Sequence, residues 1–391
     1  MAQPASIWPY FVLSGVFLLF SGGIYLIARK FSWKGVVSEG GRHESIDGLR
    51  GLLALGVFFH HALINFAFQT SGAWKAPDEP FYAMTGQLGV GFFFMITAFL
   101  FWGRILKSES GVDWVALYRS RIRRIVPMYL VAVVVLVLIA LSKAAGKSDV
   151  QYISVFTNIV RWFYFSFLGA PDINELPRTF TINAGVFWTL AYEWRFYFAL
   201  PFLAALMSIS GHWSVYVLIG FYAALSEEKF LYYFLGGMLV ADIHERRWFV
   251  SSIRSWLSDV LFVSVLYVLM SSFDTAYGFS AAVLATVAFL LMLNGGGVFG
   301  LLHTKAARLL GEVSYSIYLL HGLVITLFLS VAGSVGFRWT ASNYWPVVLS
   351  MGLILVAISV ITFRLIERPF IQKTLSVNVK ANTPTGFVRT F

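Results

Sequence analysis

Apolar stretches of nearly membrane-spanning length recur along the whole chain, and this pattern limits the fold more than any other feature. A helix needs about 20 apolar residues to cross the hydrocarbon core of a bilayer. Hydrophobic residues make up 58% of the chain and charged residues 12%, whereas a soluble domain carries about 25% charged residues. The chain is therefore expected to be an all-α, polytopic membrane protein.

Apolar length and helix-breaking residues predict about eleven membrane spans. The expected spans are 8–28, 47–68, 85–103, 125–142, 186–208, 213–225, 230–241, 256–271, 279–294, 313–331 and 346–363. The first stretch is too long for a signal-peptide core and lacks a small-residue cleavage site after it, so we interpret it as a retained helix. We expect an additional N-terminal helix with a cytoplasmic linker (1–39), one membrane domain (40–371) and a polar cytoplasmic tail (372–391).

Lys and Arg residues are concentrated in alternate loops, which predicts the orientation of the chain. Under the positive-inside rule, this bias indicates an external N-terminus and a cytoplasmic C-terminus. The net charge of +10 then reflects loops beside the membrane, so lipids are expected partners and nucleic acid is not. The chain has no cysteine, which excludes disulfides, thiol catalysis and Cys-ligated metals, and we expect no metal site.

Two loop segments carry structural expectations. Residues 155–169, VFTNIVRWFYFSFLG, are apolar and aromatic but interrupted by Asn158 and Arg161. We interpret them as an interfacial helix on the outer leaflet, with a re-entrant element lining a cavity as the alternative. The glycine-rich segment 294–300, NGGGVFG, lacks the context of a nucleotide-binding loop and is expected to be a flexible cytoplasmic turn.

Arg50 and His61 are eleven residues apart within one expected span. At about 100° per residue, eleven steps return a side chain to within about 20° of the same helix face. The helical rise places His61 about 16 Å deeper than Arg50. Because ionisable groups inside a membrane are costly and usually functional, this pair is the first candidate for a site.

Other polar side chains lie in or beside the expected spans. Asp47 precedes Arg50 by about one turn, and His60 points away from the Arg50 direction, which favours a packing or supporting role. Glu193 and Arg195 lie within FWTLAYEWRFYFALP (187–201), with Tyr197 as a further candidate. A buried carboxylate beside an imidazole orients it for general-base catalysis; the alternative for Glu193 is an ion pair with an arginine that only joins helices.

Two further segments complete the candidate residues. The basic loop ALYRSRIRRIVPMYL (116–130) carries Arg119, Arg121, Arg123 and Arg124. These residues are either ordinary cytoplasmic anchors or, together with Arg50, a phosphate-binding cluster, because guanidinium groups bind phosphate oxygens bidentately. The span containing GEVSYSIYLLHGLVI (311–325) presents Ser314, Tyr315, Tyr318 and His321, as catalytic groups or as an aromatic and polar packing seam.

Taken together, these segments resemble the acyltransferase-3 family of integral membrane acyltransferases. The resemblance covers about residues 40–371 and rests on motifs that follow one another in order. The motifs are IDGLRGLLALGVFFHH with Arg50 and His61, GVGFFFMITAFL (89–100), RSRIRRIVPMYL (119–130), FWTLAYEWRFYFALP (187–201), GEVSYSIYLLH (311–321) and IERPF (366–370). Two departures are Thr97-Ala98, where Ser-Gly is usual, and Arg195, where Gln is common; the latter is expected to add a buried charge.

The resemblance implies transfer of an acyl group, most often acetyl from acetyl-CoA, to sugars of polysaccharide, lipopolysaccharide, peptidoglycan or exported glycans. It implies a multi-pass protein of the bacterial inner membrane, no tightly bound cofactor, and partners in polysaccharide biosynthesis. Arg50 and His61 match the essential pair of the family, and Glu193, Tyr318 and His321 match its other recurrent positions.

We therefore expect acyl-CoA to bind through its phosphates to Arg50 and the basic loop, while His61 acts as general base toward a glycan hydroxyl. Glu193, or less favourably Asp47, is expected to orient the imidazole of His61. An acyl-enzyme on a Tyr or Ser is an alternative route. The rival function is a proton-coupled transporter or flippase of a glycan or lipid-linked sugar, although the sequence shows no inverted repeat.

Overall fold

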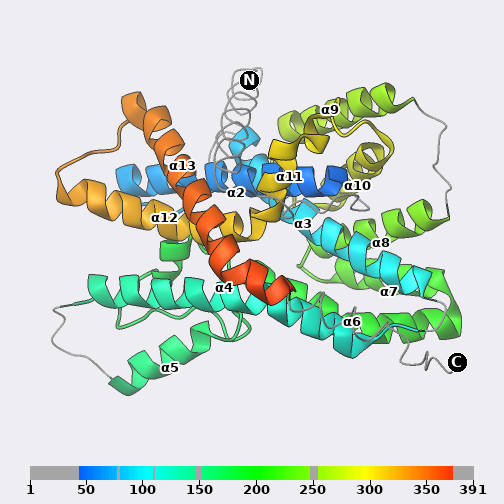
Figure 1. Ribbon diagram of the computed structural model, residues 1–391, viewed down its shortest axis with the longest axis horizontal. Coiled ribbons are helices and arrows are strands. Elements are labelled where there is room, and N and C mark those ends of the chain that lie inside the picture. The colour runs from blue at the N-terminus through cyan, green and yellow to red at the C-terminus, as the bar shows by residue number, and fades with distance from the viewer. Residues whose placement is uncertain (1–43, 77–79, 109–110, 146–151, 247–253, 373–391) are drawn as a thin grey trace, which may run out of the picture.

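The computed structural model describes residues 44–76, 80–108, 111–145, 152–246 and 254–372, and every regular element in these ranges is helical (Figure 1). The α-helices are α2 (Glu44–Ser71), α3 (Pro80–Lys107), α4 (Trp114–Lys143), α5 (Tyr152–Trp162), α6 (Trp188–Ser210), α7 (His212–Leu225), α8 (Leu231–Glu245), α9 (Ser255–Ser272), α10 (Phe279–Asn294), α11 (Lys305–Glu312), α12 (Ser314–Ser334) and α13 (Tyr344–Thr362). Short turns of other helix types are η1 (Thr179–Asn183), η2 (Leu301–His303), η3 (Ala341–Asn343) and η4 (Phe363–Glu367). The all-α class predicted from the sequence is confirmed.

Six described helices are long and apolar enough to cross a membrane. They are α2, α3, α4, α9, α12 and α13, the last continuing through η4 to Gln372. The helices α7 and α10 are apolar but shorter. The multi-pass character is therefore confirmed, whereas the count of about eleven spans is not. The expected first span, the N-terminal segment 1–39 and residues 373–391 of the tail lie outside the described residues.

Glycines let neighbouring helices approach closely around α2. A side chain on Gly86 of α3 would collide with the ring of His60, and one on Gly89 would collide with Val57. On another side of α2, a Cβ on Gly311 of α11 would collide with the backbone of Asp47. Small residues at such contacts are the usual means of tight helix packing in membranes. The three contacts fix α2 against α3 and α11.

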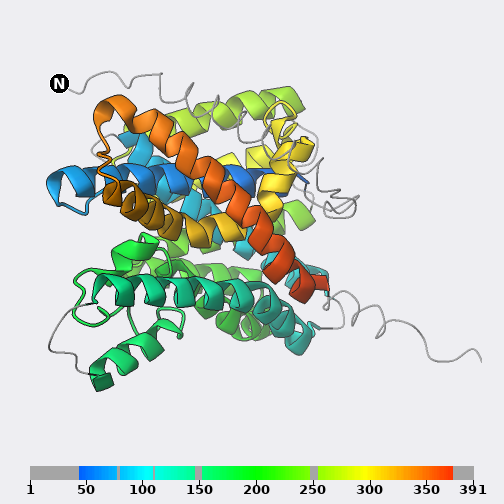
Figure 2. The ribbon, with the colours of Figure 1, turned by 60° about the vertical axis from the view of Figure 1, so that its left-hand side comes forward.

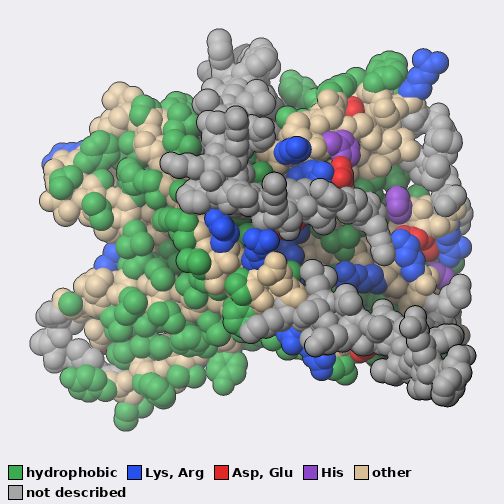
Figure 3. Space-filling model, viewed as in Figure 1, with side chains coloured by type: hydrophobic (Ala, Val, Ile, Leu, Met, Phe, Trp, Pro, Cys, Tyr) green, Lys and Arg blue, Asp and Glu red, His purple; other side chains and the backbone are tan. Residues whose placement is uncertain are grey.

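Side-chain contacts show which helix ends share one end of the molecule. Lys107 and Glu245, at the ends of α3 and α8, form an ion pair of 2.7 Å. The hydroxyl of Tyr315, at the start of α12, donates to the carbonyl of Ile125 in α4 at 2.9 Å. At the same end Ser316 donates to Glu367. We call the end where α2, α4 and α12 begin the cationic end, because Lys and Arg side chains gather toward the middle and right of the face in Figure 3.

The glycine-rich turn after α10 is held by a buried carboxylate. Asp259 of α9 accepts hydrogen bonds from the backbone N–H groups of Gly296 (3.1 Å), Val298 (3.0 Å) and Phe299 (2.9 Å). The non-glycine residues Val298 and Phe299 both have positive φ angles, which cost conformational energy unless neighbouring contacts fix them. This turn is therefore braced in a defined conformation, and it leads into η2 and α11, which pack on α2.

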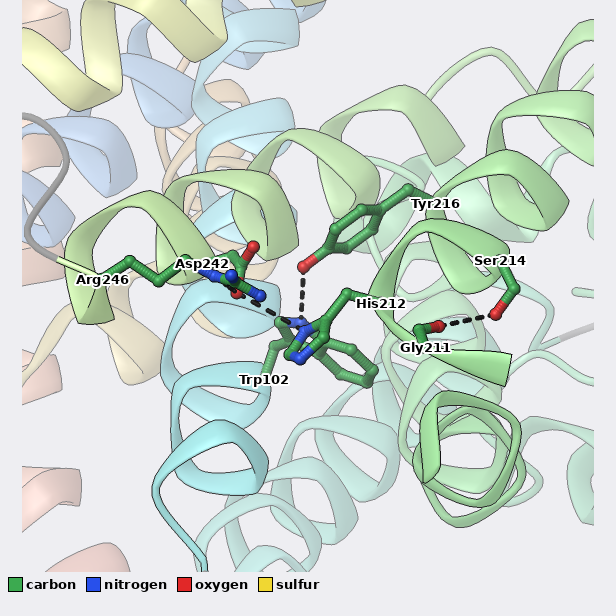
Figure 4. A network of polar contacts seen from close by, with 7 residues as sticks. All are labelled: Trp102, Gly211, His212, Ser214, Tyr216, Asp242 and Arg246. Atoms are coloured by element: carbon green, nitrogen blue, oxygen red, sulfur yellow. Dashed lines mark hydrogen bonds and ion pairs between the residues drawn. The ribbon is translucent and has the colours of Figure 1, made fainter. Parts of the chain in front are cut away.

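A polar network joins α3, α7 and α8 away from α2 (Figure 4). The indole of Trp102 donates to the hydroxyl of Tyr216 at 3.2 Å. Asp242 of α8 pairs with Arg246 at 3.0 Å and lies 3.5 Å from His212 of α7. Within an apolar bundle the first two contacts satisfy polar groups of Trp102 and Asp242 that would otherwise be buried at a cost. The network fastens the short helix α7 to its neighbours.

Helix α5 lies at the edge of the molecule in both ribbon views (Figures 1 and 2). The expected apolar element 155–169 is helical from Tyr152 to Trp162 and then continues as turns. Ile153 is 84% exposed and Phe156 is 69% exposed. A helix that presents apolar side chains outward fits the interfacial interpretation better than the alternative of a cavity-lining element.

Candidate active site

A cavity of about 250 Å³ lies between α2, α3, α4, α6 and α12. Its wall combines four arginines with apolar, aromatic and hydroxyl-bearing side chains. The lining residues are Arg50, Val90, Phe93, Phe94, Ile96, Thr97, Leu100, Phe101, Arg104, Arg121, Arg124, Ile125, Thr189, Leu190, Glu193, Tyr197, Ser314, Tyr315 and Tyr318. The cavity therefore suits a ligand with two parts: an anionic part that contacts the arginines and an apolar part that lies along the aromatic wall.

The residues of α3 that line the cavity show where the two ends of the cavity lie. Phe93, Thr97, Leu100 and Arg104 recur at intervals of four, three and four residues, so they share one face of the helix. Arg104 lies near the cationic end of α3, and the helical rise places Phe93 about 16 Å further inward. The arginines therefore form the mouth of the cavity, and Phe93 with Tyr318 belongs to its inner end.

The segment expected to be a basic loop is instead helical and forms the first part of α4. Its arginines divide into residues that reach the cavity and residues that do not. Arg121 and Arg124 line it together with Arg50, whereas Arg119 and Arg123 are absent from its wall. Helical periodicity explains the division, since 121 and 124 share a face of α4 that 119 and 123 do not. Arg104 was missed by the sequence analysis. Its place on the face that carries Phe93 and Leu100 was the signal that could have found it.

Aromatic contacts hold two of the mouth arginines. The guanidinium carbons of Arg104 and Arg121 lie 5.2 and 4.8 Å from the ring centroid of Phe101. Such cation–π contacts favour one orientation of a flexible side chain. The ring of Phe101 thus orients two guanidinium groups at the same side of the mouth.

Carboxylates surround the arginines at the mouth. The nearby charges that act on Arg50 include Asp47, Glu193 and Glu312 as well as Arg124. Burial raises the pKa of Glu312, and the neighbouring guanidinium of Arg124 partly offsets this rise. Glu312 was not a sequence candidate, because it lies in the short helix α11 and reaches the site only through the close packing of α11 on α2.

A second missed carboxylate lies behind the mouth. Glu367, from the IERPF segment, is fully buried and accepts a hydrogen bond from Ser316. Its second carboxylate oxygen has no hydrogen-bond partner among the described residues. The charges of Arg124 and Arg50 act on it. The sequence motif was visible, but only the tertiary structure brings it beside these arginines.

Two histidines from distant parts of the chain meet near the inner end. Nε2 of His321 in α12 lies 3.2 Å from Nδ1 of His61 in α2. Nδ1 of His61 also lies 3.0 Å from the carbonyl oxygen of Val57, and Nδ1 of His321 lies 3.3 Å from that of Ile317. The structure therefore brings together two residues that the sequence analysis treated separately.

The backbone partners define the tautomers of this histidine pair. A carbonyl oxygen only accepts, so the Nδ1 atom of each ring carries its proton in the neutral state. His321 then presents an unprotonated Nε2 toward the Nδ1–H of His61. This arrangement leaves Nε2 of His61 unprotonated, which is the state that a general base requires.

The expected orienting carboxylates lie elsewhere. Glu193 lines the cavity and accepts a hydrogen bond from Tyr197. Asp47 precedes His61 by 14 residues on the continuous helix α2, which is about 21 Å at helical rise. Asp47 therefore cannot orient His61, and the side chain that contacts the Nδ1 atom of this imidazole is His321.

Two further candidates, His60 and Arg195, have their polar partners outside the histidine pair, although the ring centroid of His60 lies 4.9 Å from that of His61. His60 donates through Nδ1–H to the carbonyl oxygen of Tyr82 at 2.8 Å and packs on Gly86, which fits the expected packing role. Arg195 is 51% exposed and pairs with Glu228 at 3.4 Å. The expectation that Arg195 adds a buried charge is wrong, because its position two residues after Glu193 turns it to another face of α6.

Hydroxyl groups of α12 anchor this helix to its neighbours. The Tyr318 hydroxyl lies 2.8 Å from Oγ1 of Thr189 and donates to the carbonyl of Val186 at 3.3 Å. Ser314 donates to the carbonyl of Gly311 at 2.7 Å. Tyr315, as noted above, donates to α4. All three residues line the cavity as well, so these hydrogen bonds fix part of its wall.

A strained segment before α6 covers α12 beside His321. Gly322 packs against the backbone of Asn183, where a side chain would collide, and Thr326 donates to the carbonyl of Ile182 at 3.0 Å. Arg178 and Ala184, at the two ends of η1, have positive φ angles. This segment was not predicted from the sequence, because no hydrophobic period marks it.

No group of three or more His, Asp or Glu that could hold a metal ion occurs in the part of the chain that the structure describes. The polar groups of the site are instead guanidinium groups, carboxylates, hydroxyls and the histidine pair. These groups can bind an anionic ligand and move a proton.

The class of protein follows from comparison with known families. A family model described as an acyltransferase domain matches residues 43–364. This range includes every helix that lines the cavity and both members of the histidine pair. The chain belongs to the acyltransferase-3 family and is a multi-pass membrane acyltransferase, as the sequence motifs predicted.

Curated relatives carry names that agree with this class. The exopolysaccharide production protein ExoZ of Rhizobium meliloti (strain 1021) is 27% identical over 316 residues, which cover 76% of this chain and 93% of that protein. Proteins of Staphylococcus aureus named putative O-acetyltransferase are 26% identical over 162 residues, or 40% of this chain and 24% of their own length. No solved structure matches the chain.

Proposed function

We propose that this chain transfers a short acyl group, acetyl in the first instance, from acyl-CoA to a hydroxyl group of an extracytoplasmic or lipid-linked polysaccharide. The observation that carries the proposal is the order of groups along one cavity. Guanidinium groups lie at its mouth, and Tyr318 at its inner end adjoins the histidine pair, with a ring centroid 6.0 Å from that of His321. This order matches a donor with phosphates at one end and a thioester at the other.

The donor side of the proposal rests on charge. Arg50, Arg104, Arg121 and Arg124 line the mouth, and guanidinium groups bind phosphate oxygens through paired hydrogen bonds. The negative charges of Asp47, Glu193 and Glu312 act on Arg50 at this mouth. If the cationic end faces the cytoplasm, as the positive-inside rule predicts, acyl-CoA enters from that side. The same rule gives the external N-terminus and cytoplasmic C-terminus in a bacterial inner membrane.

The chemical step uses the histidine pair. His61 accepts the proton of the acceptor hydroxyl through Nε2 while the hydroxyl oxygen attacks the thioester carbonyl carbon. The new C–O bond forms, the C–S bond breaks, and the CoA thiolate leaves and recovers the proton from the imidazolium. His321 accepts a hydrogen bond from Nδ1–H of His61, which it shares with the carbonyl of Val57, and thereby holds the base in its productive orientation. His321 is thus a positioning residue.

The acceptor side rests on the relatives and on the membrane setting. One relative is named for exopolysaccharide production and others for O-acetyl transfer, so a polysaccharide hydroxyl is the acceptor that we propose. An acceptor of this kind reaches the histidine pair from the end opposite to the arginine mouth. Such an enzyme works beside the machinery that assembles or exports the polymer.

The proposal is tested with purified full-length protein in lipid nanodiscs. Acetyl-CoA and polysaccharide extracted from cells that lack this chain are supplied, and release of free CoA thiol is measured with and without polysaccharide. We expect thiol release that depends on polysaccharide. Thiol release that is absent under all conditions, while labelled polysaccharide crosses the membrane of proteoliposomes, would instead support the transporter alternative.

A further inference from the structure

We propose that Phe93 decides which acyl groups pass from the donor cavity to the histidine pair, and that the enzyme therefore selects short, unbranched acyl-CoA. This inference rests on the function proposed above. It concerns a residue that the catalytic step does not use, on the inner wall of the cavity. Phe93 and Tyr318 both line that wall, whereas the wall includes neither His61 nor His321.

The ring of Phe93 packs edge-on against the ring of Tyr318. Their centroids are 5.8 Å apart with an interplanar angle of 64°, a favourable aromatic geometry. Tyr318 in turn adjoins His321. The two rings therefore close the cavity on the side where the histidines lie, and an acyl group has to pass them to reach His61.

Helix packing supports this order. Gly89 of α3 is opposite Val57 of α2, and Gly86 is opposite His60, so α2 and α3 run in opposite directions. Phe93 follows Gly89 by one turn and is therefore nearer to the cationic end than His61. A donor that enters between the arginines meets Phe93 before it meets the histidine pair.

The two rings differ in how firmly they are held. Tyr318 is fixed by its hydroxyl, through Thr189 and the carbonyl of Val186. Phe93 has no polar atom on its side chain, and it is only half-buried. It can therefore move aside for a narrow acyl group, whereas a branched group needs more room than the fixed Tyr318 ring allows. Discrimination by one carbon atom in an apolar pocket is typically about 10- to 200-fold.

The test compares acyl donors on the full-length protein in nanodiscs, with polysaccharide from cells that lack this chain as acceptor. Acetyl-CoA and isobutyryl-CoA are supplied to wild type, Phe93→Ala and Phe93→Leu, and kcat/KM is measured for each. We expect Phe93→Ala to raise the ratio of isobutyryl to acetyl transfer by about 10-fold or more. Phe93→Leu should raise it less. The matched control is Leu100→Ala, which widens the same face of the same cavity two turns nearer the mouth and should leave the ratio within about two-fold of wild type.

The outcomes separate this inference from the function on which it rests. Wild-type protein that releases no thiol from acetyl-CoA in the presence of the acceptor contradicts the proposed function. Active wild type together with folded Phe93→Ala or Phe93→Leu protein whose ratio is unchanged overturns the role of Phe93 alone. An equal rise in Leu100→Ala would also overturn it, because general widening of the cavity would then explain the effect.

Discussion

At the residue scale, the contact between His61 and His321 assigns a different role to each histidine: His61 is the base, and His321 positions it. Nδ1 of His321 faces a carbonyl of its own helix, which leaves Nε2 to accept from His61. A neutral acceptor orients the base without adding a charge inside the membrane, where an unpaired charge is costly. The mouth of the cavity, in contrast, gathers several charges of both signs.

We expect His321→Ala to lower kcat by about 10²-fold or more, because the imidazole of His61 loses the side chain that contacts its Nδ1–H and holds the ring in its orientation. His321→Gln keeps an oxygen that can accept from Nδ1–H and should recover most of this loss. The donor KM should stay unchanged in both variants. Steady-state kinetics with acetyl-CoA check this prediction, and a loss in His321→Gln equal to that in His321→Ala would argue for a purely packing role.

The arginines provide a second residue-scale prediction with an internal control. Arg50→Ala removes a charged donor from the mouth and should raise the donor KM by about 10- to 100-fold, which corresponds to one hydrogen bond to a charged group. Arg119 lies in the same basic part of α4 but outside the cavity wall, so Arg119→Ala should leave KM within about two-fold. Titration of donor concentration distinguishes the two, and equal effects would contradict a specific mouth.

At the element scale, the positions of the helices along the chain could be predicted from the sequence, whereas the contacts between the helices could not. Each expected span within the described residues overlaps one helix, because apolar length and Gly, Pro or polar breaks mark helix ends locally. Periodicity also placed Arg50 and His61 on one face. It could not reveal that His321, 260 residues further along the chain, contacts His61. Hydrophobic periodicity predicts which face of a helix is buried, but it does not predict which other helix packs against that face.

The short helix α11 shows the same limit. Its closeness to α2 depends on Gly311, whose missing side chain admits the backbone of Asp47. This approach delivers Glu312 to Arg50 and Arg124. The local sequence of α11, a Thr304-capped amphipathic helix, does not reveal that it packs on α2. The turn 294–300 was likewise expected to be flexible, and only the distant Asp259 explains its defined conformation.

The raised pKa of Glu312 leads to a prediction about stability and pH. A carboxyl whose pKa is higher in the folded than in the unfolded state binds its proton more tightly when folded. Its contribution to the free energy of unfolding therefore falls as pH rises through that interval. Glu312→Gln removes this term and should be more heat-stable than wild type at about pH 7.5, with a difference that shrinks toward about pH 4.

Thermal unfolding of both proteins in detergent, followed across this pH range, measures the effect. Glu227→Gln is the control, since Glu227 is exposed in a loop and should show no such dependence. A Glu312→Gln variant that is less stable than wild type at neutral pH would mean that attraction to Arg124 and Arg50 outweighs the desolvation of the carboxylate.

At the scale of the whole molecule, the mouth of the cavity opens at the end where the Lys and Arg side chains gather. The helix ends that carry the arginine mouth lie together, and the strained segment around η1 lies toward the other end, beside His321. We propose that donor and acceptor approach the histidine pair from these two opposite ends. An enzyme that joins a cytoplasmic donor to an external acceptor needs this separation.

The absence of cysteine from the chain makes its orientation directly measurable. We expect Ser334→Cys, at the end opposite to the arginines, to react with a membrane-impermeant maleimide in intact cells. Ser255→Cys, at the cationic end, should react only after the membrane is permeabilised. Both positions are exposed, so reactivity reports sidedness and not burial. The reverse pattern would contradict entry of the donor from the cytoplasm.

The central claim is that His61 takes the proton of a polysaccharide hydroxyl while the acyl group leaves CoA. The most direct measurement supplies ¹³C-acetyl-CoA and polysaccharide to wild-type and His61→Ala protein in nanodiscs and follows labelled acetyl ester on the polymer by NMR. We predict ester with wild type and a loss of about 10²- to 10⁴-fold in His61→Ala, with donor affinity unchanged in a parallel binding assay. Labelled ester formed by His61→Ala at the wild-type rate would contradict the account.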